Sequence, residues 1–246
     1  MNSPSLTAAL APTGKLRVGI NYGNPVLATR DAQSGELRGV AVDLARELGS
    51  RTELPVEIVA FESAGKMFDA VKAGAWDVAF LAVDPGRASE IDFTAPYVEI
   101  EGTYLIPAGA PFRKVADVDR DGVRVGVSGK SAYDLFLSRS LQHAQIVRAQ
   151  SPESALDLIL SNKVDVLAGV RQTLVAQSVK VPGSSVFDDC FMAIGQAMGI
   201  AKGRGEAVKY LREFVEDVKA SGFVARAIDK AGVKGVSIAP AALASV

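Results

Sequence analysis

Residues 15–20 read Lys15-Leu-Arg-Val-Gly-Ile20, and the pattern returns at residues 122–127 as Gly122-Val-Arg-Val-Gly-Val127. A second pair of segments repeats in the same order: Phe68-Asp-Ala-Val-Lys-Ala-Gly-Ala-Trp-Asp-Val78 and Leu156-Asp-Leu-Ile-Leu-Ser-Asn-Lys-Val-Asp-Val166. Each half therefore begins with a short apolar strand and later runs helix, turn, strand. The repeat predicts two lobes of similar construction, and a cleft between lobes is a common place for a small ligand.

Apolar runs and helical spacing alternate along the rest of the chain. Strands are predicted at residues 16–20, 56–61, 78–83, 123–127 and 164–168, and helices at 40–48, 133–141, 152–160 and 206–220. This alternation predicts a mostly parallel α/β sheet in each lobe. Ligands of such sheets lie beyond the carboxyl ends of the strands, so the loops after Ile20, Val83, Val127 and Ala168 are the expected binding loops.

The composition is that of a globular chain of 246 residues, with 48% hydrophobic and 22% charged residues. A net charge of -1 gives no electrostatic reason to expect nucleic acid or an anionic membrane as a partner. The single cysteine, Cys190, excludes an internal disulfide and a cysteine-rich metal site. The single histidine, His143, argues against histidine-based zinc sites and Ser-His-Asp catalysis. We expect neither a metal nor a cofactor.

The first 14 residues lack a basic region followed by an apolar stretch, so they do not form an intact secretory signal. No apolar run of 18 residues predicts a transmembrane helix. Two readings stay open: a signal was removed, or the protein remains inside the cell.

Five segments then resemble one known family, the extracellular solute-binding proteins of the polar amino-acid type, which serve ABC importers. Gly35-Glu-Leu-Arg-Gly-Val-Ala-Val-Asp-Leu-Ala45 is similar to the family pattern G-x-L-x-G-F-x-V-D-L-A. Arg87-Ala-Ser-Glu-Ile-Asp-Phe-Thr-Ala-Pro-Tyr97 is similar to E-R-x-x-x-x-D-F-S-x-P-Y. Residues 68–77, 126–131 and 162–165 resemble three further family segments in the same order. Together the matches run from about Leu16 to about Lys230.

The resemblance implies a type II periplasmic binding protein fold of the α/β class. Two Rossmann-like lobes with mostly parallel sheets would be joined by two hinge strands, with residues 1–106 plus 200–246 in lobe 1 and 107–199 in lobe 2. The implied function is to bind a small solute in the cleft between the lobes and to present it to the permease of an ABC transporter. The protein would act as a monomer in the periplasm or outside the cell; a cytoplasmic location stays open because the chain carries no signal.

Departures from the family pattern bear on the ligand. In amino-acid binders the resemblance places an arginine for the ligand carboxylate after the P-Y pair, and that position falls here on Thr103. The family aspartate for the ligand ammonium falls close to Val170, with Arg171 next to it. Both charged anchors of an α-amino acid are therefore absent. The chemistry of Ser131, Thr103 and Arg171 predicts instead a small polar, anionic organic solute.

Ser131 and Ala132 begin a predicted helix, whose backbone N–H groups can bind an anion. The alternative for Ser131 is an ordinary N-cap. Arg171 follows a buried strand and could pair with a ligand carboxylate; the alternative is a structural salt bridge.

Asn21, Tyr22 and Asn24 follow the first strand. The tyrosine could stack on a ligand and an asparagine amide could bond it, but turn chemistry explains the same residues. Four further residues complete the predicted ligand-binding set, although the phenylalanine is more often a core residue: Phe80, Ala82, Thr103 and Gln196.

Two other functions are compatible with the sequence. An enzyme on this scaffold, similar to cyclohexadienyl dehydratase, would need an acid or base with a perturbed pKa, for which only Glu101 and Glu62 are candidates. A ligand-sensing domain would have to act through a partner. The repeated Asp77 and Asp165 suggest a catalytic pair, but both occupy the same helix-to-strand turn, so we interpret them as turn-stabilising residues and expect no catalytic residue.

Overall fold

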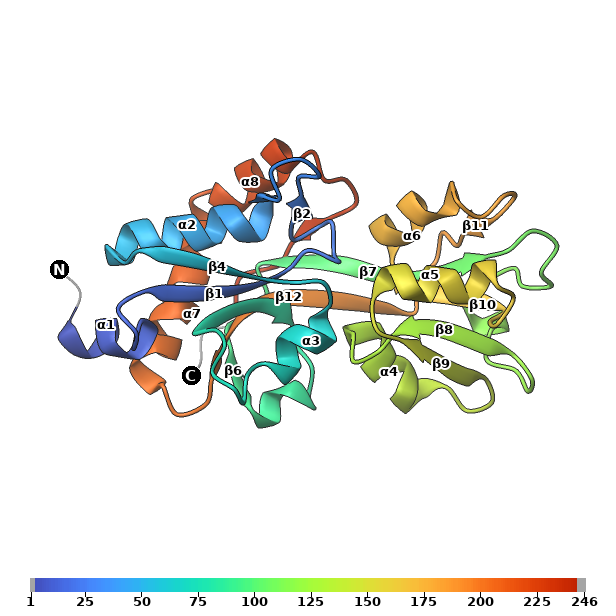
Figure 1. The fold of residues 1–246 in the computed structure, drawn as a ribbon, viewed down its shortest axis with the longest axis horizontal. Coiled ribbons are helices and arrows are strands. Elements are labelled where there is room, and N and C mark those ends of the chain that lie inside the picture. Colours follow the sequence, from blue (N-terminus) through green and yellow to red (C-terminus); the bar gives the residue numbers. More distant parts are fainter. Residues whose placement is uncertain (1–2, 243–246) are drawn as a thin grey trace. The chain divides into compact units, whose positions relative to one another are not determined.

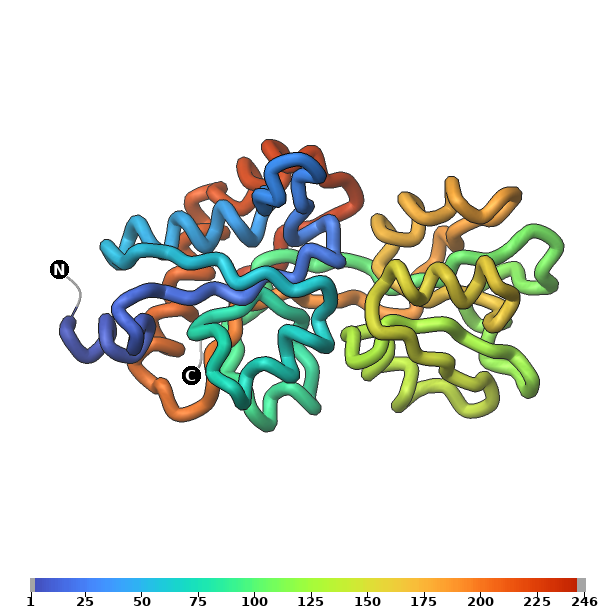
Figure 2. The backbone as a smooth tube through the Cα atoms, viewed as in Figure 1, coloured from blue at the N-terminus to red at the C-terminus, as the bar shows by residue number. Residues whose placement is uncertain are grey.

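The computed structural model describes residues 3–242, and the chain divides into two compact units (Figures 1 and 2). Unit 1 comprises the described parts of Met1–Glu62, Lys66–Glu99 and Gly195–Val246, and unit 2 comprises Ser63–Gly65 and Ile100–Ile194. The chain leaves unit 1 within β7 (Val98–Ile106) and returns to it within β12 (Met192–Ala201). The predicted lobe boundaries fall a few residues farther along these two strands. A hinge role for the strands stays a prediction.

The sheet of unit 1 has the strand order β4-β1-β5-β12, formed by β4 (Val56–Phe61), β1 (Leu16–Asn21), β5 (Val78–Ala82) and β12. β1 is parallel to both β4 and β5, whereas β12 is antiparallel to β5. Shorter strands extend the pairing, with β6 (Ile91–Phe93) on β12 and β13 (Ser237–Ile238) on β7. A separate hairpin pairs β2 (Thr29–Arg30) with β3 (Leu37–Arg38).

Helices bury an apolar stripe against the unit 1 sheet because their hydrophobic residues recur at helical spacing. These helices are α1 (Pro4–Leu10), α2 (Val40–Thr52), α7 (Gly205–Ala220) and α8 (Phe223–Ala231), as Figure 1 shows. Their leucines and valines form one core cluster with Ile20 and Phe80 from the strands. A smaller cluster contains Trp76 and Leu81, and the Trp76 indole donates a hydrogen bond of 2.9 Å to the carbonyl of Met67 in α3 (Ala64–Asp69).

Unit 2 has the strand order β7-β10-β8-β9, with β8 (Arg124–Ser128), β9 (Gln145–Ala149) and β10 (Val166–Val170) parallel to one another. β7 is antiparallel to β10 and also pairs with β11 (Ser185–Val186). The helices of this unit are α4 (Ala132–Ser140), α5 (Pro152–Leu160) and α6 (Arg171–Ser178), with short 3-10 turns at Val115–Asp117 and, in unit 1, Arg87–Ser89. The α/β class is confirmed, but the sheet is mixed. The strands β1, β4 and β5, and likewise β8, β9 and β10, are parallel, whereas β12 and β7 pair antiparallel with their neighbours β5 and β10.

None of the helices in residues 3–242 is long and apolar enough to cross a membrane.

Candidate functional site

The carboxyl ends of β1 and β5 lie at one edge of the unit 1 sheet, because the two strands are parallel neighbours. The edge is marked by Asn21 at the end of β1 and Ala82 at the end of β5. β12 runs in the opposite direction, so its Gln196 lies opposite Ala82 at this same edge. Ligands of α/β sheets bind at such an edge. The topology therefore brings predicted site residues of three different strands together within unit 1.

The loop after β1 uses its asparagines for its own turn. The Oδ1 atom of Asn21 accepts a hydrogen bond from the backbone N–H of Gly23 at 2.9 Å, and Oδ1 of Asn24 accepts from Val26 at 3.1 Å. Both asparagines are buried. The Arg30 guanidinium lies 5.3 Å from the ring centroid of Tyr22, within the range of a cation–π contact. The turn-forming alternative thus has direct support, and ligand contact by these three residues stays a prediction.

Phe80 and Ala82 point to the same face of the sheet, since they are two residues apart on one strand. The Phe80 ring is fully buried in the unit 1 core and meets the Tyr97 ring edge-on, with the ring centroids 5.7 Å apart. The Ala82 carbonyl accepts a hydrogen bond from Nη1 of Arg87 at 2.9 Å. Phe80 is therefore a core residue in this structure, and a ligand role for it or Ala82 stays a prediction.

Arg87 is a residue that sequence reasoning did not select. Arg87 comes after β5 and the turn Asp84-Pro-Gly, and it is only 1% exposed. Burial lowers the pKa of the guanidinium to about 10, and the neighbouring Asp84 carboxylate opposes that shift. An arginine is rarely this buried, because removing its charge from water is costly. The available signal was its position directly after the turn that ends a fully buried strand.

Gln196 and Tyr97 are linked through the backbone, where the N–H of Tyr97 donates to the carbonyl of Gln196 at 2.8 Å. Gln196 is 4% exposed and Tyr97 is fully buried. Among the residues that the structure describes, neither Oε1 of Gln196 nor the hydroxyl of Tyr97 has a hydrogen-bond partner. Burial also raises the pKa of the Tyr97 phenol, so the group stays neutral at physiological pH.

The predicted site residues of unit 2 hold the connection that leads into β12. The Thr103 hydroxyl is buried and donates to the Asp189 carbonyl at 2.7 Å. Arg171 donates through Nη1 to the Phe187 carbonyl and through Nη2 to the Asp188 carbonyl at 2.8 Å. Its Nε lies 2.5 Å from the Glu101 carboxylate. This contact is the structural salt bridge that was expected as the alternative to a ligand role. Ligand contact by Thr103 and Arg171 stays a prediction.

The start of α4 is already occupied by side chains of its own unit. Ser131 is the N-cap, and its Oγ accepts the backbone N–H of Asp134 at 3.1 Å, while Ala132 takes the first helical position. The buried Asp134 carboxylate accepts the N–H of Lys130 at 2.7 Å and pairs with Arg148 at 3.0 Å. A negative charge therefore already lies at this helix N-terminus, where it is electrostatically favoured. The predicted anion contact of Ser131 and Ala132 stays a prediction.

The two candidate acids of the enzyme hypothesis are engaged in ion pairs. Glu101 pairs with Arg171, and Glu62 pairs with Lys66. Within residues 3–242 no group of three His, Cys, Asp or Glu side chains is arranged to hold a metal ion.

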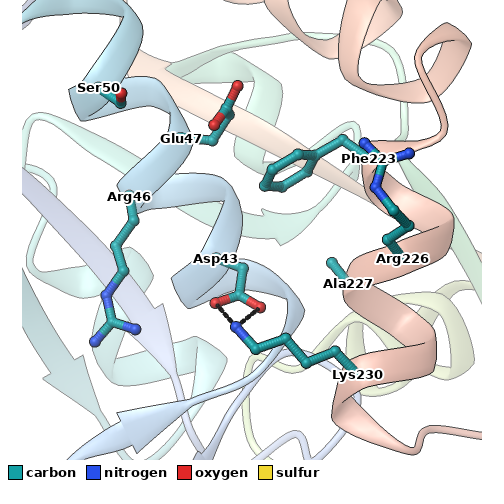
Figure 3. Close-up of a pocket in the computed structure, with 8 residues that line it drawn as sticks. All are labelled: Asp43, Arg46, Glu47, Ser50, Phe223, Arg226, Ala227 and Lys230. Atoms are coloured by element: carbon teal, nitrogen blue, oxygen red, sulfur yellow. Dashed lines mark hydrogen bonds and ion pairs between the residues drawn. The ribbon is translucent and has the colours of Figure 1, made fainter.

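A groove of about 390 Å³ lies between α2 and α8 on unit 1, away from the predicted site residues (Figure 3). An ion pair of 2.9 Å between Asp43 and Lys230 crosses it, and the Phe223 ring lies beside Glu47 and Arg226. The remaining lining residues are Arg46, Ser50 and Ala227. None of the ten predicted ligand-binding residues lines this groove.

Two curated proteins are similar to the chain. The histidine-binding periplasmic protein of Escherichia coli is 23% identical over 236 residues, which cover 89% of this chain and 88% of that protein. The virulence sensor protein BvgS of Bordetella pertussis is 27% identical over 144 residues, which cover 58% of this chain and 11% of the sensor. The chain thus spans about a tenth of the sensor and most of the binding protein.

Solved structures share the fold. A solute receptor for L-cysteine from Neisseria gonorrhoeae superimposes with a TM-score of 0.79 at 22% identity, covering 92% of each chain. That receptor and the relative from Escherichia coli are binding proteins, not enzymes. Residues 16–233 match the family model of the bacterial extracellular solute-binding proteins, family 3. Since this match takes in most of the chain, the protein belongs to the bacterial extracellular solute-binding proteins of family 3.

Proposed function

We propose that the protein binds a small polar organic solute with an anionic group and presents it to the permease of an ABC importer. Membership of an extracellular solute-binding family supports the binding role and an extracytoplasmic location. The histidine-binding relative that spans most of the chain supports delivery to a transporter rather than chemistry on the solute.

The observation that carries the anionic group is the buried Arg87 guanidinium at the sheet edge where β1 and β5 end. A cation in a poorly hydrated place gains more from an anion than an exposed one does, because the local dielectric is low. Its depressed pKa shows that desolvation outweighs the attraction of Asp84. A carboxylate matches the planar fork of a guanidinium. We therefore propose Arg87 for the solute anion rather than Arg171, because the Arg171 side chain is 20% exposed and Arg87 is only 1% exposed.

A panel of small acids and their neutral amides, measured by thermal shift and then by calorimetry, tests this proposal. At least one acid should stabilise the wild-type protein, and its amide should not. Arg87→Met should weaken the binding of that acid at least tenfold, and Arg87→Lys should recover part of it. Arg226→Met is the matched control, because Arg226 is an exposed arginine of the same unit. Unchanged acid binding in Arg87→Met, or tighter binding of a cation without any acid group, would refute the anionic assignment.

A second candidate is a ligand-sensing role, favoured by the similarity to the sensor BvgS. Both roles use the same binding event, so the discriminating measurement is made in cells. Loss of solute uptake on deletion of the gene supports transport. Intact uptake together with a lost transcriptional response to the solute would support sensing instead.

A further inference from the structure

Two buried polar groups of unit 1 lack an internal partner: among the described residues, Gln196 Oε1 and the Tyr97 hydroxyl accept or donate no hydrogen bond. Native proteins satisfy almost all buried polar atoms, so each exception calls for an explanation. A buried water can satisfy such atoms, and so can a bound ligand. The two explanations predict opposite results when the polar atom is removed.

The place of Gln196 favours the ligand. Gln196 lies opposite Ala82 in the ladder between β12 and β5, and directly opposed residues share a face of the sheet. The carbonyl of the same Ala82 holds the Arg87 guanidinium at 2.9 Å. Ala82 therefore accepts a hydrogen bond from the buried Arg87 guanidinium through its backbone carbonyl, and it lies opposite the Gln196 side chain of the neighbouring strand β12.

Strand β12 cannot shift its register to move the Gln196 amide away from the edge of the sheet. A methyl group on the neighbouring Gly195 would come within 2.7 Å of the Pro96 side chain, and one on Gly199 would come within 2.7 Å of Ile91. Close packing on both sides of Gln196 thus fixes the register that keeps its side chain at the edge of the sheet.

We infer that Gln196 is a specificity-determining residue whose Oε1 accepts a hydrogen bond from an uncharged donor on the solute. This inference rests on the proposed function, in which Arg87 holds the solute anion. Gln196, Tyr97 and Phe80 are uncharged, and the buried Asp84 carboxylate, two residues beyond Ala82, already faces the charge of Arg87. An ammonium group buried among the three uncharged residues would lack a counter-charge, which is costly, whereas a hydroxyl would not. The inferred solute class is a small hydroxy acid, with the hydroxyl near the carboxylate.

Matched pairs of acids that differ by one hydroxyl group test the inference on the full chain: lactate and propionate, malate and succinate, 3-hydroxybutyrate and butyrate. The wild-type protein should bind the hydroxy acid of at least one pair more tightly. Gln196→Leu keeps the size of the side chain and removes the acceptor. It should reduce that preference at least tenfold, or about 1.4 kcal/mol, while the affinity for the acid without the hydroxyl stays within twofold.

Unfolding of the unliganded protein supplies a second readout that needs no ligand. If Oε1 is reserved for a solute, Gln196→Leu removes an unsatisfied atom and should raise Tm by about 2–4 °C. Tyr97→Phe should also raise Tm. Gln177→Leu is the matched control, because the amide of the buried Gln177 donates to the Pro152 carbonyl at 3.0 Å and its loss should lower Tm.

The two proposals fail in different ways. If unliganded Gln196→Leu has a lower Tm than the wild-type protein, Gln196 is a structural residue. That result would overturn the inference regardless of which acids the protein binds. Acid binding that depends on Arg87 but shows the same hydroxyl preference in Gln196→Leu would overturn the inference alone. Failure of every acid to bind the wild-type protein would overturn the proposed anion site and the inference together.

Discussion

The guanidinium of Arg17 forms a two-point ion pair with the carboxylate of Asp77. Nε lies 3.0 Å from Oδ2 and Nη2 lies 2.8 Å from Oδ1, and the backbone N–H of Arg17 also donates to Oδ2 at 3.1 Å. Asp77 is fully buried, and Arg204 lies 3.4 Å from its Oδ1. The pair joins the start of β1 to the turn that leads into β5.

Unit 2 repeats this pair with Arg124 and Asp165. The three contacts measure 3.0, 2.8 and 2.7 Å in the same order. In each unit the aspartate N–H also donates to the arginine carbonyl at 2.8 Å. In each unit the first repeated segment supplies the arginine and the second supplies the aspartate of the same ion pair. This repetition supports the turn-stabilising interpretation of both aspartates.

Asp77→Asn should lower the free energy of unfolding by about 1.5–3 kcal/mol, because Asp77 is fully buried and the change removes the charge from its hydrogen bonds with Arg17. Urea denaturation measures the change. Glu57→Gln is the control, since Glu57 pairs with Lys15 at the surface and should cost at most about 1 kcal/mol. Equal losses in the two variants would contradict the structural role of Asp77.

Asp165 predicts a dependence of stability on pH. The Arg124 side chain, and then the backbone N–H of Arg124, lower the pKa of this carboxyl against an opposing desolvation. A carboxyl whose folded pKa is depressed stabilises the folded state above its unfolded pKa of about 3.9, and that contribution is lost as the pH falls through the folded value. Asp165→Asn should therefore reduce stability at pH 7, and this loss should shrink progressively as the pH falls below about 3.9.

Chemical denaturation of the wild-type protein and Asp165→Asn from pH 7 down to pH 2 checks this prediction. Asp157→Asn, on the solvent side of α5, controls for the loss of one negative charge. A stability difference that grows on acidification would show that the pair does not behave as described.

The hydroxyl of Thr103 predicts a stability effect in unit 2. Thr103→Val keeps the shape of the side chain but removes the donor to the Asp189 carbonyl. Because the site is fully buried, we expect a loss of about 1–3 kcal/mol, and Thr103→Ser should recover most of it. If Thr103→Val were as stable as the wild type but bound the solute poorly, the predicted ligand role of Thr103 would be favoured over the structural one.

Much of the fold could be predicted because it depends on local patterns. The repeated strands and the apolar spacing of residues 40–48 and 206–220 indicated β1, β8, α2 and α7. Helix α1 was not predicted, because residues 1–14 were considered only as a possible secretory signal. Its own signals are local too: Ser3 caps the helix by accepting the N–H of Leu6, Pro4 takes the first position, and Leu6 and Leu10 are buried.

The site was harder to predict because its contacts join distant residues. The partner of Thr103 is a carbonyl 86 residues away, and the arginine fork of Arg171 reaches three carbonyls in a loop. No pattern in the neighbouring sequence reports such partners. The burial of Arg87 is equally non-local, because its position after the turn that ends β5 does not report how deeply the side chain is buried. Gln196 was predicted as a site residue, yet the lack of a hydrogen-bond partner for its Oε1 among the described residues is visible only in three dimensions.

Gly23 is required by a close backbone approach in the loop after β1. A Cβ atom at this position would lie 2.2 Å from the Glu62 carbonyl oxygen, which belongs to the backbone and cannot rotate away. Gly23→Ala should therefore destabilise the protein by more than about 1 kcal/mol and displace Asn21, whose side chain bonds the Gly23 N–H. Gly205→Ala is the matched control, because Gly205 begins α7 in open space and alanine there should be neutral or stabilise the helix by up to about 1 kcal/mol. Urea titration of the two variants decides the matter: a neutral Gly23→Ala would mean that the loop moves away from Glu62 at little cost, and that the edge carrying Asn21 is not rigidly built.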